Sequence, residues 1–300
     1  MSGPKFLLLG KNGQLGWELQ RALAPLGDVI ALGRDEADLA DTDSLSAQVE
    51  ALRPQVIVNA AAYTAVDKAE AEEPLAQAIN GDAPAHLAQL AHKLGARLIH
   101  YSTDYVFAGD KAEPYTEADT PAPLSAYGRS KLAGEQAVLA ASPRNFVFRT
   151  CWVYGRHGGN FVKTILRLAK EKDALRVVHD QVGAPTPAAL IADITAQVLG
   201  QVLRRPGEVP AGGLYHLAAG GETSWHGFAT EIVREARRLG LEAKLMAEAI
   251  AAIPASGYPL PAPRPANSRL DCAKLSTIFN LNLPPWQTFL APILADILTP

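Results

Sequence analysis

The sequence predicts an α/β fold, in which a doubly wound parallel sheet carries helices on both faces. Short apolar runs alternate with helical patterns through the first half of the chain, and a glycine-rich loop joins the first run to the first helix. The composition agrees, because 48% hydrophobic and 20% charged residues over 300 positions are typical of a globular protein with a sizeable core.

The first half is expected to contain strands and helices in alternation. The apolar runs that we interpret as strands are 5–9, 29–32, 55–58, 97–101 and 145–148. The segments with helical spacing lie between them, at 15–26, 43–52, 75–94 and 125–141. Strands separated by helices of this length form βαβ units, so the sheet is expected to be parallel.

The second half of the chain is less regular. Its helical patterns and its one late apolar run occupy 161–172, 188–203, 225–239 and 214–217, and the proline-rich stretch 253–268 suits an ordered wrapping segment. We predict an NAD(P)-binding domain over 1–150, to which 188–217 returns. A smaller C-terminal substrate-binding lobe is expected from the remainder, 151–187 and 218–300.

Charge and composition exclude several classes of protein. The net charge is −3 at pH 7, so no surface for nucleic acid or an anionic membrane is expected. No apolar stretch approaches the roughly 18 residues that span a bilayer, and the first apolar run is too short for a signal peptide. Cys151 and Cys272 match neither a disulfide framework nor a metal spacing. We therefore expect a cytoplasmic protein with reduced thiols and predict no metal ligands from residue spacing.

A glycine loop lies where the first predicted strand ends and the first helix begins. Gly10 permits a tight turn, Gly13 lets the backbone approach a pyrophosphate, and Gly16 lets the helix pack close to the strand. The free N–H groups and the positive dipole end of the helix then face the phosphates. We predict a Rossmann-type domain whose dinucleotide contacts include Gly10, Gly13, Gln14, Leu15 and Gly16.

Two later strand ends are expected to contact the same cofactor. Arg34 follows the second strand, where a guanidinium suits a 2′-phosphate and favours NADPH, with NADH use left open. Asp38 and Leu39 come a few residues later and are expected beside the adenosine. The third strand ends in small residues, which let a flat cofactor pass beside Ala62, Tyr63 and Thr64.

A tyrosine and a lysine stand four residues apart on one predicted helix. Of eight tyrosines, only Tyr127 has a lysine at the fourth following position, Lys131, so the two share a helix face. A cation within about 4–6 Å lowers the pKa of a phenol, which is otherwise about 10. We predict Tyr127 as proton donor, Lys131 as its activator and a ligand of the cofactor ribose, and Thr103 as a strand-end hydroxyl beside them.

Some of these positions have simpler interpretations, which stay open. Arg34 is alternatively a solvated surface arginine, and Tyr63 and Thr64 alternatively serve tight strand packing. Asn80, within the helix at 75–94, is either an anchor for a water or a backbone bend near the lysine or an ordinary helix-face residue.

Segments along nearly the whole chain carry a family resemblance. They read GKNGQLGWEL (10–19), RPQVIVNAAAYTAVD (53–67), YSTDYVF (101–107), YGRSKLAGE (127–135), RTCWVY (149–154), DQVGAPT (180–186) and RPANSRL (264–270). The chain thereby resembles the extended short-chain dehydrogenases/reductases, and among them the family of dTDP-4-dehydrorhamnose reductases. The first four segments occur in looser form in many nucleotide-sugar enzymes, whereas the last three together are more specific.

The resemblance implies NAD(P)H-dependent reduction of the 4-keto group of dTDP-4-dehydro-6-deoxy-L-mannose to dTDP-L-rhamnose, for cell-surface polysaccharide such as O-antigen. It also implies a homodimer, with Mg²⁺ at its interface and Glu18 matching one carboxylate position. The departure at Gly33-Arg34, where some members carry an acidic residue, argues against exclusive use of NADH. Substrate contacts are implied for Thr103, Asp104, Trp152, Arg264, Asn267 and Ser268.

Three other functions remain as alternatives. A sugar-nucleotide 4,6-dehydratase needs a second carboxylate after Asp104, where this chain has Tyr105. An epimerase would hold NAD⁺ permanently, which purified protein would reveal. A non-catalytic regulatory subunit of the methionine adenosyltransferase type would be a binding module, against which the intact Thr103, Tyr127 and Lys131 argue. Trp152 and Arg264 have structural alternatives of their own, a core aromatic and a surface charge.

Overall fold

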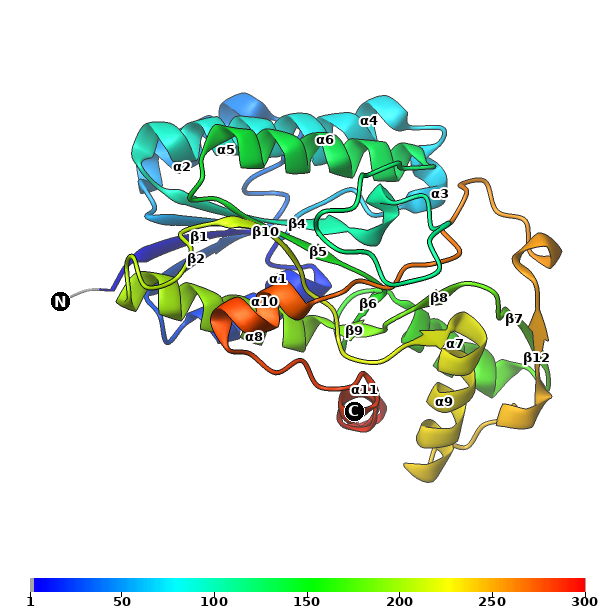
Figure 1. Ribbon diagram of the computed structural model, residues 1–300. Helices are drawn as coiled ribbons and strands as arrows, with labels where there is room; N and C mark the ends of the chain where they lie inside the picture. Colours follow the sequence, from blue (N-terminus) through cyan, green and yellow to red (C-terminus); the bar gives the residue numbers. More distant parts are fainter. Residues whose placement is uncertain (1–2, 300) are drawn as a thin grey trace.

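The computed structural model describes residues 3–299 and is built on a parallel sheet of six strands, with helices on both faces (Figure 1). Residues 1–2 and 300 of the two predicted units lie outside the described residues. Every neighbouring pair of strands in the sheet is parallel. The order across the sheet is β2 (Asp28–Leu32), β1 (Lys5–Leu9), β3 (Val56–Asn59), β4 (Arg97–Thr103), β5 (Phe146–Thr150) and β10 (Gly213–His216). The predicted fold class is confirmed.

The strand order changes direction between β1 and β3. From β1 the chain first moves outward to β2, and then returns to β3 and proceeds the other way through β4, β5 and β10. In open α/β sheets, ligands bind at such a switch point, beyond the carboxyl ends of the strands.

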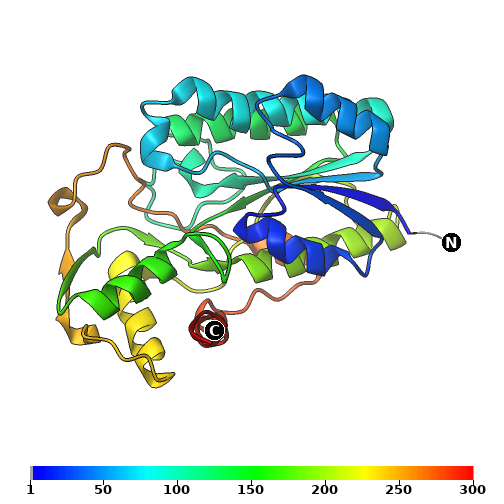
Figure 2. The same cartoon turned by 180° about the vertical axis from the view of Figure 1, so that it is seen from behind.

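Two helical layers cover the sheet (Figures 1 and 2). Phe6, Leu8 and Tyr101 belong to the core on the side of α1 (Gln14–Leu23) and α8 (Ala188–Arg204). Leu7, Leu9 and Leu98 belong to the core on the other side, which is closed by α2 (Thr42–Leu52), α5 (Ala83–Leu94) and α6 (Ala126–Ala141). Because both faces are buried, the strands are continuous apolar runs rather than alternating ones.

The predicted helix at 75–94 is interrupted. It consists of α4 (Glu73–Gln77), a π-helical segment η1 (Ala78–Asp82) and α5. Asn80 lies in the π-helical segment, accepts a hydrogen bond from the Tyr63 N–H at 2.9 Å, and donates to the Tyr63 carbonyl at 3.0 Å and to Ser130 Oγ at 3.1 Å. Of the two interpretations of Asn80, the structure supports the anchor of a bent backbone, beside α6.

The second half of the chain adds smaller elements below the sheet (Figure 1). Helix α8 packs along α1, and β10 extends the sheet beside β5. Helices α10 (Ala273–Phe279) and α11 (Gln287–Leu298) were not predicted, because α10 is short and α11 contains Pro292.

The remaining elements of the whole chain, with these two helices, are α3 (Val66–Ala69), η2 (Asp104–Val106), β6 (Val153–Tyr154), α7 (Phe161–Glu171), β7 (Leu175–Val178), β8 (Val182–Gly183), β9 (Thr186–Pro187), β11 (Thr223–Ser224), α9 (Trp225–Arg238), η3 (Ala247–Ala249), β12 (Ile250–Ile253), η4 (Ala255–Gly257), α10 (Ala273–Phe279) and α11 (Gln287–Leu298).

The segment 254–268, which we call the strap, runs from β12 to the neighbourhood of α3 and back (orange in Figure 1). Its backbone is tied in the middle and at its C-terminal end: the Ala262 N–H donates to Asp67 Oδ1 at 3.2 Å, and the Ser268 N–H donates to the Val182 carbonyl at 2.8 Å. The strap is therefore an ordered wrapping segment, as its proline content predicted.

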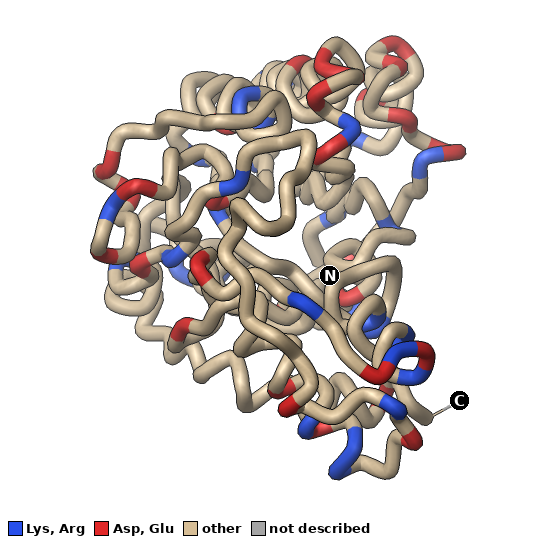
Figure 3. Tube along the Cα trace, turned by 90° about the vertical axis from the view of Figure 1, so that its right-hand side faces the viewer, with Lys and Arg blue, Asp and Glu red and all other residues tan. Residues whose placement is uncertain are grey.

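Charged residues of both signs are interspersed around the outside of the chain in the view of Figure 3. This distribution agrees with the small net charge of −3. Within residues 3–299, no helix combines the length and apolar character needed to cross a bilayer.

Candidate active site

A cavity of about 620 Å³ opens beyond the carboxyl ends of β1, β2, β3 and β4, at the switch point of the sheet. It gathers predicted cofactor-binding residues from four separate parts of the chain. Of the predicted set, the lining includes Gly10, Gly13, Gln14, Leu15, Arg34, Asp38, Leu39, Ala62, Tyr63, Thr64, Tyr127 and Lys131.

The glycine loop forms one end of this cavity. Gly10 has a φ of 86°, and a Cβ there would lie 2.8 Å from the Ala61 nitrogen, so only glycine fits. Gly16 does not line the cavity; a side chain at this position would collide with the Gly10 carbonyl, so its role is close packing of α1 on the loop. Gly13 precedes α1 without a side-chain cap, and no acidic residue stands in the first turn. The exposed N–H groups suit a pyrophosphate.

Arg34 also lines the cavity, and it lies next to the glycine loop, because the Gly10 N–H donates to the Leu32 carbonyl at the end of β2 at 2.9 Å. The Arg34 guanidinium is 76% exposed and pairs with Asp38 four residues later, Nε to Oδ2 at 3.2 Å. The pKa of Asp38 is lowered, first by the N–H of Ala40 and then by Arg34. An exposed pair of this kind is weak, so Arg34 is free to turn toward an anionic ligand.

Tyr127 and Lys131 are brought to the cavity by α6. Ser125 caps this helix by accepting a hydrogen bond from the Gly128 N–H at 3.1 Å, which starts the helix directly before Tyr127. Lys131 is buried; its Nζ donates to the Tyr101 carbonyl at 2.6 Å and lies 3.4 Å from His100 Nε2. The ammonium therefore lies beside the C-terminal part of β4.

Burial governs the titration of both groups. It raises the pKa of Tyr127, and the nearby Asp104 adds to the rise, while a hydrogen bond with Thr103 opposes it. Burial also lowers the pKa of Lys131 to about 8, against the opposing charge of Glu135. The predicted lowering of the Tyr127 pKa by Lys131 is not seen in this arrangement, because burial raises this pKa and Lys131 is not among the groups that shift it.

Thr103, Asp104 and Ser268 form a polar cluster next to Tyr127. The Thr103 hydroxyl donates to Asp104 Oδ1 at 3.0 Å, and Ser268 is a further hydrogen-bond partner of this carboxyl group. Burial raises the pKa of Asp104 to about 6, and its Oδ2 has no partner among the described residues. The cluster thus brings a buried, incompletely paired carboxyl group close to the tyrosine.

Three other residues predicted to contact substrate are engaged with the protein. The Arg264 guanidinium bonds both oxygens of Asp67, at 3.0 and 2.8 Å. The Asn267 amide donates to the carbonyls of Lys111 and Glu113, both at 2.8 Å. The Trp152 ring stacks on Trp225, with centroids 3.6 Å apart. These residues shape the lobe, and none of them lines the cavity.

Several lining residues were missed by the sequence reasoning. Ser102 and Thr150 line the cavity at neighbouring strand ends, and both hydroxyls are buried without a hydrogen-bond partner within residues 3–299. Their strand-end positions were an available signal. Gly158 and Gly159 carried none, because only the fold brings their loop to the cavity, with Gly158 beside Gln14. Unpaired hydroxyls, a glycine cradle and an exposed arginine fit a phosphorylated dinucleotide.

The implied magnesium site finds no such support. Glu18 on α1 lies 3.6 Å from Arg21, which in turn bonds Asp193 on α8 at 2.8 Å. Among residues 3–299, no group of three His, Cys, Asp or Glu side chains could hold a metal ion. The described residues of one protomer therefore do not fit this ion.

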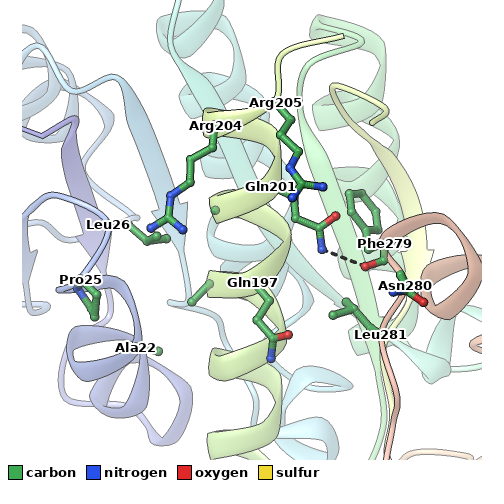
Figure 4. Close-up of a pocket in the computed structure, with 12 residues that line it drawn as sticks. Ala22, Pro25, Leu26, Gln197, Gln201, Arg204, Arg205, Phe279, Asn280 and Leu281 are labelled. Atoms are coloured by element: carbon green, nitrogen blue, oxygen red, sulfur yellow. Dashed lines mark hydrogen bonds between the residues drawn. The ribbon is translucent and has the colours of Figure 1, made fainter. Parts of the chain in front are cut away.

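A second cavity, of about 560 Å³, lies between α1, α8 and the end of α10 (Figure 4). Gln201 donates to the Phe279 carbonyl across it at 2.8 Å, and Arg204 and Arg205 stand at its rim. None of the predicted site residues lines it. Arg204 is the last residue of α8 and Arg205 caps it, so both stand at the negative end of the helix dipole, which favours cations there.

The doubly wound sheet, the glycine loop at its switch point and the tyrosine–lysine pair on α6 define an extended short-chain dehydrogenase/reductase. Comparison with known proteins narrows this class. Residues 4–299 match the family model described as RmlD substrate binding domain.

Named relatives cover almost the whole chain. The chain is 48% identical to dTDP-4-dehydrorhamnose reductase of Salmonella typhimurium and 47% identical to that of Escherichia coli K12, each over 297 residues, or 98% of both chains. It also resembles the crystal structure of dTDP-4-dehydrorhamnose reductase from Bacillus anthracis in complex with NADP, at 34% identity, a TM-score of 0.85 and 98% coverage of each chain. The chain belongs to the dTDP-4-dehydrorhamnose reductase family and is an oxidoreductase.

Proposed function

We propose that this protein uses NADPH to reduce the 4-keto group of dTDP-4-dehydro-6-deoxy-L-mannose, giving dTDP-L-rhamnose. The observation that carries the proposal is that Tyr127 and Lys131 line a dinucleotide-sized cavity, with the Thr103–Asp104 pair next to Tyr127. The names of relatives that match over 98% of the chain support the choice of sugar nucleotide.

Different residues of the cavity would bind different parts of the cofactor. The glycine loop and the N–H groups at the start of α1 would hold the pyrophosphate, and Arg34 would pair with the 2′-phosphate. Ser102, Thr150 and Lys131 would hold the nicotinamide riboside, since they line the same cavity as Tyr127 and the two hydroxyls have no partner among the described residues. When bound there, NADPH supplies the hydride that the C4 carbon receives.

Tyr127 supplies the proton that the reduction requires. Its raised pKa keeps the phenol protonated at neutral pH, so it is ready to donate to the C4 oxygen as negative charge develops there. The Thr103 hydroxyl, hydrogen-bonded to the tyrosine, steadies the phenol, and the resulting phenolate is favoured by the nearby ammonium of Lys131. Lys131 then returns a proton to the tyrosine and is itself reprotonated from water.

We assign the sugar nucleotide to the space bordered by the Thr103–Asp104–Ser268 cluster and the lobe built from 151–187 and 218–299. Residues 3–150 together with 188–217 make up the cofactor-binding domain in this proposal. Trp152 would present the face that Trp225 leaves open. Arg264 and Asn267 would act by holding the strap and the loop at 111–113 in place.

The wider setting follows from the family. We propose a cytoplasmic homodimer that prefers NADPH, accepts NADH more weakly and supplies rhamnose for cell-surface polysaccharide such as O-antigen. Because Glu18 faces Arg21, magnesium at a dimer interface would require carboxylates from a second copy.

The test offers the purified protein dTDP-4-dehydro-6-deoxy-L-mannose with NADPH and follows the near-ultraviolet absorbance of the reduced nicotinamide. We expect one NADPH oxidised per dTDP-L-rhamnose formed. Oxidation only with a different keto sugar would reassign the substrate, and no oxidation with any would favour a binding module. Protein purified with bound NAD⁺ would favour an epimerase, and loss of water from dTDP-glucose would favour a dehydratase.

A further inference from the structure

His100 is a buried titratable residue that the mechanism above does not use. It lies on β4, is 1% exposed, and stands between two other side chains. Its Nδ1 is 3.3 Å from Asn59 Nδ2 on the neighbouring strand β3, and its Nε2 is 3.4 Å from Lys131 Nζ on α6. The three residues form a lateral chain between the sheet and α6, with Lys131 at the end that meets the cavity.

The direction of the hydrogen bonds in this chain follows from Asn59. Its Oδ1 accepts a hydrogen bond from the Ala61 N–H at 3.2 Å, so its Nδ2 is the atom turned to the imidazole. An amide nitrogen only donates, and His100 Nδ1 must therefore accept. Burial, and next the charge of Lys131, lower the pKa of His100 well below its usual range, so the ring is neutral. A neutral ring that accepts at Nδ1 carries its one hydrogen on Nε2.

We propose that His100 is a positioning residue that stabilises the neutral amine of Lys131 by donating its Nε2 hydrogen to it. An N–H pointed at an ammonium group finds no lone pair, whereas a neutral amine offers one. The Asn59–His100 pair thus favours the form of Lys131 that has just released a proton. This inference rests on the proposed function only in its consequence, the return of a proton to Tyr127.

The proton balance is simple. The Lys131 ammonium gives one proton to the Tyr127 phenolate, its freed lone pair accepts the His100 Nε2 hydrogen bond, and a water proton later restores the ammonium. The other ionisable groups around the pair are Tyr127 and Glu135 on α6 and Arg149 on β5. Glu135 opposes the lowering of the Lys131 pKa, but its carboxylate is bonded to Arg149 in a buried ion pair and makes no hydrogen bond to the lysine. From β3, the contact is the uncharged Asn59.

Histidine tautomers can be read directly from long-range ¹H–¹⁵N correlation spectra of the cofactor-free protein, and this chain contains its own references. His226 Nε2 faces the Ile250 carbonyl at 2.9 Å and must therefore carry a hydrogen on Nε2. His216 Nδ1 faces the Tyr115 carbonyl at 3.0 Å and must therefore carry a hydrogen on Nδ1. We expect the His100 signals, assigned by their loss in His100→Gln, to match the pattern of His226 at neutral pH. A pattern like that of His216, or a charged ring, would overturn the proposal.

Substitutions test the link to Lys131. In His100→Gln, the amide can accept from Asn59 and donate to Lys131, so we expect at least a third of the wild-type kcat and an unchanged basic limb in the pH profile. His100→Leu fills the space without a donor and should lose at least tenfold more kcat than His100→Gln. Equal activity of the two variants would mean that His100 only fills space, and would refute the proposal.

Asn59→Asp should reverse the direction of the hydrogen bonds from residue 59 through His100 to Lys131. A carboxylate accepts from Nδ1, which moves the imidazole hydrogen there and turns Nε2 into an acceptor for the ammonium. The spectrum of His100 should then change to the His216 pattern, and the basic limb of kcat should move up by about one pH unit or more. An unchanged tautomer would contradict the proposal. Because the spectra need neither substrate nor cofactor, failure of the proposed reduction would leave this tautomer test intact.

Discussion

Arg264 of the strap and Asp67 of α3, 197 residues apart in the chain, are joined by two hydrogen bonds of 3.0 and 2.8 Å. The Arg264 side chain is 18% exposed, and that of Asp67 is 37% exposed. The pair closes the strap against the first half of the molecule, and it lowers the pKa of Asp67, with the Arg264 hydrogen bond as the largest cause. Arg264, which the sequence predicts to bind substrate, is thus bonded to Asp67 and holds the strap against α3.

Asp67→Asn should loosen the strap without unfolding the protein. A partly exposed ion pair contributes at most about 1 kcal/mol, so the melting temperature should fall only slightly. Limited proteolysis should cut faster within 254–268, and KM for the sugar nucleotide should rise more than KM for NADPH. Glu222→Gln, which removes the carboxylate that pairs with Arg269 instead, is the matched control. Equal rates of proteolysis in the two variants would show that the Arg264–Asp67 pair is not needed to keep the strap ordered.

Tyr127→Phe should lower kcat by at least the roughly 10²-fold that loss of a general acid costs, while NADPH binding stays nearly unchanged. The change removes one oxygen and keeps the ring. Tyr154→Phe removes a buried hydroxyl that has no partner within the described residues, and should leave kcat within about threefold. Turnover of Tyr127→Phe within threefold of wild type would exclude it as the proton donor.

Arg34→Ala should weaken NADPH and spare NADH. A charge-assisted contact with the 2′-phosphate contributes roughly 1.5–3 kcal/mol, which corresponds to an increase in KM of about tenfold to a hundredfold. Initial rates with both cofactors measure the ratio. Lys93→Ala removes another exposed cation, paired with Glu50 away from the cavity, and should leave both KM values unchanged. An equal rise in KM for NADPH and NADH would show that Arg34 does not bind the 2′-phosphate.

The pH profile should report Lys131. Its pKa of about 8 lies below the ordinary lysine value, so the ammonium that returns a proton to Tyr127 is present below pH 8 and is lost as pH rises through it. We expect kcat to be level below this value and to fall about tenfold per unit above it. Lys131→Arg, whose guanidinium stays charged, should be slower but lack this basic limb. A limb that persists in the arginine variant would belong to another group.

Local pattern alone determined much of this molecule. The strands 5–9 and 97–101, the helix that carries Tyr127 and Lys131, and the glycine loop before α1 lie where the sequence predicts them, because apolar spacing and capping residues act within a few positions. The rule that strand ends gather at one edge then explains why Arg34 and Ala62 line one cavity.

Tertiary structure decided which side chains remain free for a ligand. Sequence spacing cannot reveal that Arg264 pairs with Asp67, that Asn267 serves two loop carbonyls, or that His100 meets Lys131, since each contact joins segments that only the fold brings together. The same holds for the pKa of Tyr127: the lysine four residues later is visible in the sequence, but the burial that raises this pKa is a property of the packed core. Motifs therefore locate the chemistry, and long-range packing sets the charge and the availability of each group.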